Sequence, residues 1–370
     1  MKKGRDEMMQ RPDENIKLSC LITNYNQISW IGKAVDSILE QDIRYPYEIL
    51  IGDDGSSDGS LEFLREKYKD KDQVRILVQD RDAGVKEFPN WRHSRLIFRL
   101  LDEARGEYVS ILDGDDYYCD KNHFQHKIEL LDRKENSDCS ACYGNMYKLI
   151  DGKLELYPYI PYTEGKYQWQ KDKIYTHLAT AVIRRKALED VPREIFYEQF
   201  VDWEVTTWLT YKGLFYYDPK PCFVYRVLEN SIFHGHSVDL LSLRQVLICD
   251  SNYQAYGGKR ITFFRPRKRN VFTLYDRKGL AEDIDYEMWN AFAEKYHATI
   301  ALMLLNKENL KVSEKLWLWF FVLRLREPWK IVMNRLKGYC IGISQICSPK
   351  TSMTQKRKLL RDWWMRITKN

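Results

Sequence analysis

The sequence predicts an α/β fold, with a mostly parallel central sheet flanked by helices and followed by a helical C-terminal extension. Short apolar runs alternate with segments of helical spacing over residues 18–112. Three of these runs end in small polar or acidic residues. The composition, 44% hydrophobic and 30% charged in a chain of 370 residues, allows a large buried core. Strands that alternate with helices form parallel sheets covered on both faces.

The predicted elements of the first part follow one another in order. Apolar runs place four strands, at residues 18–23, 47–52, 74–79 and 107–112. Apolar residues at helical spacing place three helices between them, at residues 28–39, 60–68 and 93–104.

The second part, residues 127–237, is less regular. A helix is expected at 200–211, and two strands are expected at 214–217 and 222–226. Five prolines mark loops, namely Pro158, Pro161, Pro192, Pro219 and Pro221.

Polar residues stand at the carboxyl ends of three predicted strands, where parallel sheets bind ligands. They form the segments 23–26 (TNYN), 53–56 (DDGS) and 113–116 (DGDD). The three carboxylates of DGDD repel one another unless a cation is present, and their oxygens suit Mg²⁺ or Mn²⁺ held together with phosphates. The alternative is an acidic turn. The acidic residues at the end of a second strand favour a shared site.

The segment 53–56 allows two interpretations. It can form a turn and a helix N-cap, because Ser56, Ser57 and Asp58 are all good caps. It can also bind a nucleobase edge or a ribose, with the helix N-terminus near an anionic ligand.

Residues 17–59 and 106–116 resemble the family 2 glycosyltransferases of the GT-A fold, which use nucleotide-diphosphate sugars. The resemblance combines a T-x-Y-N turn, an S-I-L-x-Q helix end, a D-D-G-S segment and a D-x-D-D segment, in that order. It is dense up to residue 116 and thinner afterwards. We therefore expect a GT-A domain over residues 14–240, a helical extension of unknown role over 241–310, and a tail over 311–370.

The resemblance implies which residues bind the donor. Thr23 and Tyr25 would contact the nucleotide base, and Asp54, or failing that Asp53, would read its edge. Asp113 would lie near the ribose or the donor sugar.

The resemblance also implies a divalent metal, Mn²⁺ or Mg²⁺, which would stabilise the departing nucleoside diphosphate as a Lewis acid. Asp115 would bind this metal, and Asp116 would stand beside it as a contact to phosphate or donor. A histidine of the later loop, His234 or His236, would complete the metal site, because a neutral imidazole is a metal ligand. Otherwise that loop is simply exposed to solvent.

Arginines could neutralise the phosphate charge. Arg226, which precedes the histidine loop, is one candidate, and Arg184 and Arg185 are others. All three could equally be surface groups. Residues 82–93 depart from the family pattern, and no donor contacts are assigned from them.

An inverting transfer also needs a carboxylate that removes the proton of the acceptor hydroxyl. The family places this base in an E-D pair at the start of a helix, and the equivalent here is Asp202. Val201 stands where the family often has Glu, which leaves Glu204 and Glu198 as substitutes. Without the resemblance, Asp202 could equally be a first-turn residue favoured by the helix dipole.

Charge is unevenly distributed along the chain. Residues 311–370 hold 14 Lys/Arg and 3 Asp/Glu, whereas the rest of the chain holds 45 and 50. An apolar stripe with basic residues around it predicts an interfacial helix, formed by Leu359, Leu360, Trp363, Trp364 and Ile367. Such a helix is typical of peripheral contact with an anionic membrane, although it could instead pack on the body. No nucleic-acid recognition motif accompanies the charge, so nucleic acid is not expected as a partner.

The polar first 17 residues contain no apolar signal-peptide core, and the eight cysteines are scattered. A cytoplasmic protein on the inner face of the cell membrane is therefore expected. The pair Cys139 and Cys142 is expected to be buried rather than to bind zinc.

Together these observations predict a metal-dependent, inverting hexosyltransferase. It would move a sugar from a nucleotide-diphosphate donor, a UDP-sugar by family precedent, to a hydroxyl of a cell-surface or lipid-linked glycan. A sugar-nucleotide-forming nucleotidyltransferase is an alternative, but the segment TNYNQ lacks the Gly-rich basic loop that it would need. A non-catalytic, membrane-associated nucleotide-binding protein is the other.

Overall fold

The computed structural model describes residues 15–81, 89–157, 163–168, 177–191, 193 and 202–228. Some predictions lie outside these residues: the metal role of His234 and His236, the substitute base Glu198, and the segments 241–310 and 311–370. The side chain of Glu204 lies outside the description as well.

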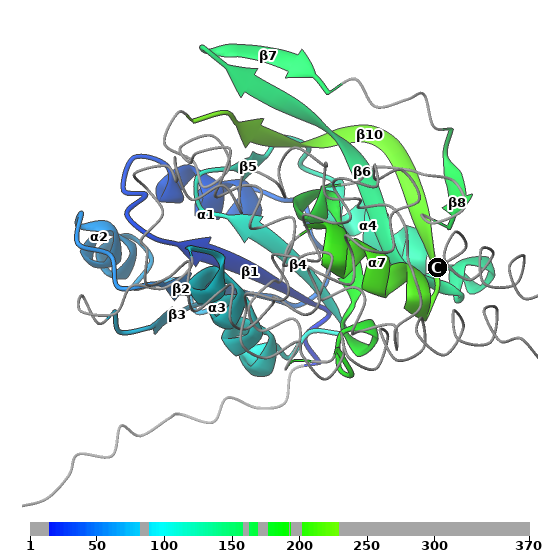
Figure 1. Ribbon diagram of the computed structural model, residues 1–370, viewed down its shortest axis with the longest axis horizontal. Helices are drawn as coiled ribbons and strands as arrows, with labels where there is room; N and C mark the ends of the chain where they lie inside the picture. The colour runs from blue at the N-terminus through cyan, green and yellow to red at the C-terminus, as the bar shows by residue number, and fades with distance from the viewer. Residues whose placement is uncertain are drawn as a thin grey trace, which may run out of the picture. The chain divides into compact units, whose positions relative to one another are not determined.

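Ten strands of the described residues form one sheet (Figure 1). They are β1 (Leu18–Asn24), β2 (Tyr47–Asp53), β3 (Val74–Val78), β4 (Tyr108–Asp113), β5 (Tyr117–Tyr118), β6 (Cys139–Ile150), β7 (Lys153–Leu156), β8 (Gly165–Tyr167), β9 (Val182–Arg184) and β10 (Leu214–Arg226). The order is β3-β2-β1-β4-β9-β6-β10-β5, with β7 beside β6 and β8 beside β10. β1 pairs in parallel with β2 and β4, as do β2 with β3 and β6 with β10. The remaining pairs are antiparallel. The predicted parallel sheet is thus confirmed for its first half and becomes mixed in its second.

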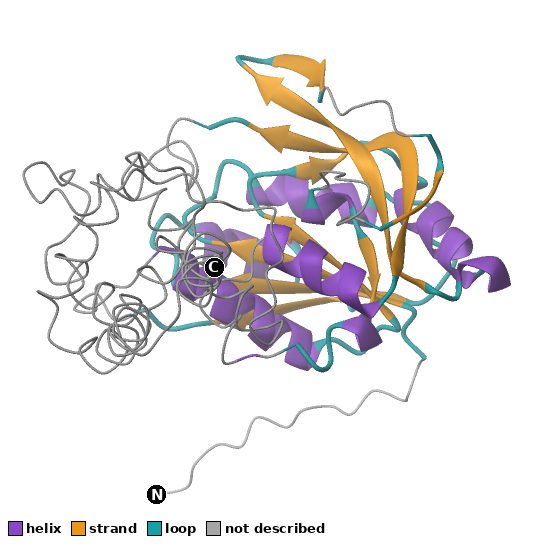
Figure 2. Cartoon of the chain, turned by 45° about the vertical axis from the view of Figure 1, so that its right-hand side comes forward, coloured by secondary structure: helices purple, strands orange, loops and turns teal. Residues whose placement is uncertain are grey.

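Helices cover both faces of the sheet (Figure 2). They are α1 (Ile31–Leu39), α2 (Ser60–Lys67), α3 (Pro89–Glu103), α4 (His123–Asp132) and α7 (Asp202–Lys212). Strand β1 shows how the faces are divided, because successive side chains of a strand point to opposite sides. Leu21 packs into the core that α3 and α7 cover, whereas Cys20 and Ile22 pack into the core of α1, α2 and α4.

Helix α3 begins at Pro89, earlier than the start predicted at residue 93. Proline is favoured in the first turn of a helix, where its missing N–H costs no hydrogen bond. The earlier start adds Arg92 to the helix, in front of His93, and both residues contribute to the site described below.

The two strands expected at 214–217 and 222–226 are one continuous strand, β10. The prediction that Pro219 and Pro221 lie in loops is therefore wrong. The pairing between β10 and β6 slips at these prolines, and prolines are tolerated in a strand where the ladder is irregular in this way. β10 continues beyond the slip and carries Arg226 to the candidate site.

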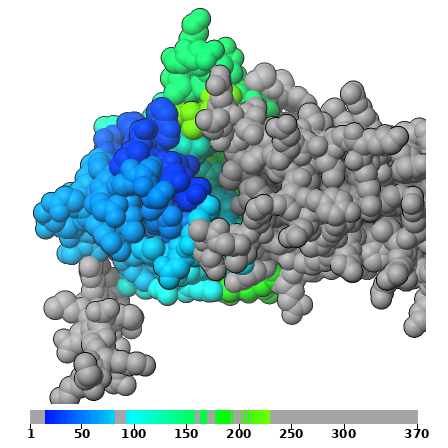
Figure 3. All heavy atoms as spheres, turned by 60° about the vertical axis from the view of Figure 1, so that its left-hand side comes forward, coloured from blue at the N-terminus to red at the C-terminus, as the bar shows by residue number. Residues whose placement is uncertain are grey.

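Strand β6 was not predicted from the sequence. Its first part lies in the core, where Cys139 and Cys142 are buried free thiols, as expected. Its second part pairs with β7 in a hairpin, the green projection of Figure 3, where Leu154 and Leu156 are exposed. None of the helices in the described ranges is long and apolar enough to cross a membrane.

Candidate active site

Three strand ends meet at the carboxyl edge of the sheet. β1 lies between β2 and β4, and such a point of reversal in the strand order opens a crevice for ligands. The pairing register places Thr23 opposite Asp113 and Asn24 opposite Asp53. The three polar segments therefore come together, as the alternating pattern of strands and helices predicts.

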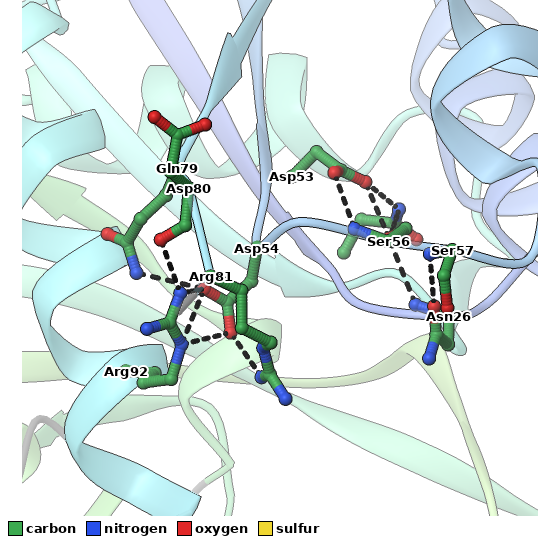
Figure 4. Close-up of polar contacts among 10 residues, drawn as sticks. Asn26, Asp53, Asp54, Ser56, Ser57, Gln79, Asp80, Arg81 and Arg92 are labelled. Atoms are coloured by element: carbon green, nitrogen blue, oxygen red, sulfur yellow. Dashed lines mark hydrogen bonds and ion pairs between the residues drawn. The ribbon is translucent and has the colours of Figure 1, made fainter. Parts of the chain in front are cut away.

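Asp53 shapes the turn that follows β2 (Figure 4). Its buried carboxylate accepts hydrogen bonds from the Ser56 amide (2.9 Å), the Ser56 hydroxyl (2.7 Å) and the Asn24 side chain (2.7 Å). Gly55 follows with φ of 71°, in the left-handed region that glycine adopts readily. Both oxygens of Asp53 are occupied within the protein, which is the turn-forming role that the sequence left open.

Asp54 points away from this turn, into a group of polar and cationic side chains (Figure 4). Its carboxylate accepts hydrogen bonds from Gln79 (2.9 Å), Arg81 (2.6 Å) and Arg92 (2.6 Å). The guanidinium of Arg81 also lies 3.6 Å from the centroid of the Tyr25 ring, a cation–π contact. Tyr25 is 41% exposed, whereas Asp54 is only 5% exposed. Arg81 therefore contacts both the buried carboxylate of Asp54 and the exposed ring of Tyr25.

Thr23 and His93 both contact Asp113 at the end of β4. The Thr23 hydroxyl donates to Oδ1 of Asp113 at 2.8 Å, and Nε2 of His93 lies 2.9 Å from the same oxygen. Burial by itself would raise the pKa of Asp113, but the charge of His93 and these two hydrogen bonds lower it to about 2. Asp113 is therefore held as a carboxylate.

Asp115 lies two residues further on, and its carboxyl group has a higher pKa than that of Asp113. Burial, and after it the negative charge of Asp113, raises the pKa of Asp115 to about 6. A carboxylate whose charge is destabilised by a neighbouring carboxylate suits a divalent cation, which neutralises both. Among the described residues, no three His, Cys, Asp or Glu side chains gather to hold a metal by themselves. This donor set fits Mg²⁺ or Mn²⁺ bound by one or two carboxylates together with substrate phosphates.

Asp116 and Arg226 connect the DGDD segment to the end of β10. The buried carboxylate of Asp116 accepts the Arg226 amide at 2.7 Å, and the Arg226 guanidinium donates to the Asp115 carbonyl. Burial, together with the charge of Asp115, raises the pKa of Asp116. The same guanidinium lies over the rings of Trp30 and Tyr117, 4.8 and 4.6 Å from their centroids. These contacts fix the DGDD turn in place and bring a cation beside its carboxylates.

Asp202, the first residue of α7, lies beside His177 and the start of the 3₁₀ helix that follows it. Its Oδ1 accepts the Leu178 amide at 2.9 Å, and its Oδ2 lies 3.7 Å from Nε2 of His177. Burial raises the pKa of the Tyr225 phenol, and four carboxylate charges raise it further, those of Asp116, Asp115, Asp113 and Asp202. Tyr225 thus lies within electrostatic reach of all four carboxylates.

The two other arginines considered from the sequence serve the fold elsewhere. Arg184 donates to the carbonyls of Leu131 and Cys139, and Arg185 donates to the carbonyl of Gly106. These contacts lie at the start of β4, at the end of the strand opposite the site. A phosphate-binding role for Arg184 and Arg185 is therefore wrong.

Sequence reasoning missed Arg81, Arg92, His93 and His177 as site residues. Arg92 and His93 lie in the run that departs from the family pattern, and no donor contact was assigned from it. Their position on the helix that precedes β4 was the available signal. Arg81 and His177 stand in no recognisable motif.

Comparison with known proteins supports the assignment of the fold. Residues 19–192 match the family described as Glycosyl transferase family 2. An uncharacterized protein of Mycobacterium tuberculosis is 23% identical over 232 residues, which make up 60% of this chain and 62% of that protein. The GalNAc(5)-diNAcBac-PP-undecaprenol beta-1,3-glucosyltransferase of Campylobacter jejuni is 26% identical over 227 residues, 60% of this chain and 68% of that enzyme. The chain thus matches less than two thirds of the length of the mycobacterial relative.

Among solved structures, S. aureus TarS 1–349 in complex with UDP-GlcNAc has a similar fold. The TM-score is 0.54 at 18% identity, and the match covers 79% of this chain and 84% of that one.

The fold, with polar residues gathered at the carboxyl ends of β1, β2 and β4, is that of a GT-A domain. Residues 19–192, nearly half of the chain, form a glycosyltransferase family 2 domain. The family match ends at residue 192, so the role of Asp202 must be argued from geometry.

Proposed function

We propose that this protein is an inverting glycosyltransferase that uses a nucleotide-diphosphate sugar, with a UDP-sugar as the donor. The observation that carries the proposal is the short series of contacts that joins Asp202 on α7 to the DGDD segment at the end of β4. Asp202 lies 3.7 Å from His177, whose ring packs against Tyr225, and the next residue, Arg226, contacts Asp115 and Asp116. Two carboxylates suited to a metal and a separate, partly exposed carboxylate are what a metal-assisted transfer to a hydroxyl needs. The UDP-GlcNAc bound by TarS supports the choice of donor class.

Asp202 is the proposed general base. It would take the proton of the acceptor hydroxyl while the acceptor oxygen forms its bond to the anomeric carbon. The bond between that carbon and the diphosphate breaks on the opposite face, and its electron pair leaves with the nucleoside diphosphate. About 30% of the Asp202 side chain is exposed, so an acceptor can reach it.

Asp115, with Asp113 beside it, would hold the Mn²⁺ or Mg²⁺. When bound, this metal supplies Lewis-acid stabilisation of the charge on the leaving diphosphate. Arg226 is pinned beside the DGDD segment, and its guanidinium would add positive charge near the same phosphates.

The Tyr25 ring and the Arg81 guanidinium would bind the nucleobase of the donor. Tyr25 is exposed, and Arg81 is anchored by Asp54. A nucleobase can therefore stack on this pair while the ion pair between Arg81 and Asp54 stays intact. The acceptor proposed is a hydroxyl of a lipid-linked or cell-surface glycan. Its support is the Campylobacter relative, whose name identifies an undecaprenol-diphosphate-linked acceptor. Peripheral contact of the protein with the membrane remains part of this proposal.

A thermal-shift screen of nucleotide sugars, with Mn²⁺ and with EDTA, tests the donor and the metal together. A ligand that binds only the folded state raises the melting temperature. We expect one UDP-sugar to do so in the presence of Mn²⁺ and to lose the effect in EDTA. Equal shifts in both conditions would contradict the metal assignment.

Asp202→Asn then separates catalysis from binding. The variant should keep the donor-induced shift and lose sugar transfer by about 10²–10⁴-fold, the usual contribution of a general base. A wild-type protein that binds the donor but neither transfers nor hydrolyses it would instead be a binding protein.

A further inference from the structure

His177 stands directly before the 3₁₀ helix η2 (Leu178–Thr180) and beside the proposed base. Its ring packs against Phe223 and Tyr225, with centroids 5.1 and 5.6 Å away. Only 13% of the side chain is exposed. Both aromatic neighbours belong to β10, so the ring is held against the same strand that carries Arg226.

The two ring nitrogens of His177 have different partners. Nδ1 accepts a hydrogen bond from the backbone amide of Ala179 at 3.3 Å. Because an amide can only donate, Nδ1 is the acceptor, and a neutral ring then carries its proton on Nε2. Nε2 is the nitrogen that lies 3.7 Å from Oδ2 of Asp202. The donor end of His177 therefore faces the carboxylate.

Asp202 is held at two points. Its Oδ1 accepts the Leu178 amide at 2.9 Å, and its Oδ2 faces His177. At 3.7 Å the second contact is longer than a hydrogen bond, but contacts of catalytic groups commonly tighten once substrate is bound. The two oxygens of the carboxylate thus have different partners in one segment, the Leu178 amide for Oδ1 and His177 for Oδ2.

We propose that His177 is a positioning residue for Asp202. Its Nε2–H fixes the plane of the carboxylate, so that the remaining lone pair of Oδ2 faces the acceptor hydroxyl. This inference rests on the proposed role of Asp202 as the base. The other titratable groups near the ring are Asp113 and Tyr225.

Two substitutions separate the nitrogens of His177. In His177→Gln, the side-chain amide reaches about as far as Nε2 and can donate to Asp202, but nothing replaces Nδ1. In His177→Asn, an oxygen stands where Nδ1 was and can still cap η2, but no donor reaches Asp202.

We expect His177→Gln to keep kcat within about threefold and His177→Asn to lower it about 10-fold to 100-fold, part of the 10²–10⁴ that a positioned base contributes. The KM for the donor should stay unchanged in both, because neither change touches the nucleotide site. His177→Asn retains the cap, so its melting temperature should remain close to that of the wild type.

His126→Gln is the matched control, since Nε2 of His126 lies 3.8 Å from Oδ2 of Asp218, outside the site. It should leave kcat unchanged.

The reverse order, with His177→Asn active and His177→Gln impaired, would show that His177 only caps η2, and it would overturn the inference. Equal activity of the two variants would overturn it as well. Wild-type transfer that is lost in Asp202→Asn establishes the proposed function independently of His177. Should the wild type transfer no sugar, or Asp202→Asn remain active, the proposed function fails and this inference fails with it.

Discussion

Asp113 and Asp115 show how two neighbouring carboxylates acquire different properties. Thr23 and His93 donate to Asp113 and stabilise its charge. None of the described side chains donates to the carboxylate of Asp115, which also experiences the charge of Asp113. The pKa is accordingly about 2 for Asp113 and about 6 for Asp115. Of the two, only Asp115 has a pKa near neutrality.

This difference predicts how metal binding depends on pH. A carboxylate must lose its proton before it can bind a metal. Below the raised pKa of Asp115, about 6, protons compete with Mn²⁺, so the apparent affinity should fall up to about tenfold per pH unit. Titration of Mn²⁺ by calorimetry between pH 5 and 8 measures this.

Asp113→Asn tests whether the charge of Asp113 raises the pKa of Asp115. It removes the charge that raises the pKa of Asp115, so the midpoint of the pH dependence should move to lower pH even though the metal binds more weakly overall. An unchanged midpoint would mean that Asp113 does not set the pKa of its neighbour.

Asp53 and Asp54 are adjacent in sequence but have separate tasks. Asp53→Asn removes an acceptor of the turn hydrogen bonds and should lower the free energy of unfolding by about 1–3 kcal/mol. Asp54→Asn leaves that turn intact but frees Arg81 from its carboxylate, so the Kd for the nucleotide should rise about tenfold. Chemical denaturation and nucleotide titration of both variants measure the two effects. A larger affinity loss in Asp53→Asn than in Asp54→Asn would reverse the assignment.

At the scale of elements, the turn between β4 and β5 depends on close packing against β1. The Gly114 amide donates to the Thr23 carbonyl at 2.8 Å. A Cβ at Gly114 would lie 2.5 Å from Oε1 of Gln27 and 2.8 Å from both the Thr23 carbonyl oxygen and Cδ1 of Ile31. Only glycine therefore lets the two strand ends approach this closely.

Gly114→Ala should cost about 1–3 kcal/mol of stability through overpacking, and it should also abolish transfer because it displaces Asp113 and Asp115. Gly152→Ala is the matched control. Gly152 has φ of 78° with open space around it, so the substitution should cost about 1 kcal/mol and leave kcat unchanged. Activity retained in Gly114→Ala would show that the turn tolerates displacement.

The sequence predicts the elements that are locally determined. The apolar runs of β1 to β4 identify strands, and the acidic residues after β2 and β4 identify the edge where ligands bind. β6 and the continuous β10 could not be predicted, because their pairing slips at bulges and passes through prolines. The contact between His177 and Asp202 depends on where α7 docks, which no local pattern specifies.

At the scale of the whole molecule, the buried carboxylate of Glu48 and its partly exposed arginine partners stabilise the end of the sheet opposite the site. Glu48 is 1% exposed and accepts hydrogen bonds from the Ser19 hydroxyl (2.7 Å), the Arg105 amide (2.8 Å) and the Arg105 guanidinium (2.7 Å). Burial opposes its ionisation, but the hydrogen bonds from Arg105 and Ser19 outweigh burial and lower its pKa.

The direction of that shift gives a stability prediction. A carboxylate whose pKa is lower in the folded state stabilises the fold above its unfolded pKa, near 4.5 for Glu48, and this contribution disappears as the pH falls through the folded value. Glu48→Gln should lower the free energy of unfolding at pH 7 by about 3 kcal/mol and flatten its dependence on pH below 5.

Glu129→Gln is the control for this variant. Glu129 pairs with Arg44 at the surface, and such pairs contribute less than about 1 kcal/mol. Urea denaturation at pH 7 and pH 4 compares the two. Equal losses of stability would contradict the role assigned to Glu48 and its arginine partners.

The two contacts of Arg226 determine when the site can form during synthesis of the chain. Arg226 joins Asp115 and Asp116 across more than a hundred residues, and contacts of such long sequence separation form late in folding. While the ribosome is still adding β10, β1 to β4 can already pair, but the DGDD turn has no partner for the Asp116 carboxylate. A nascent chain therefore completes the edge formed by β1 and β2, where we propose that the nucleobase binds, before it completes the proposed diphosphate site. A chain released before residue 226 lacks the residue that holds the DGDD turn in place.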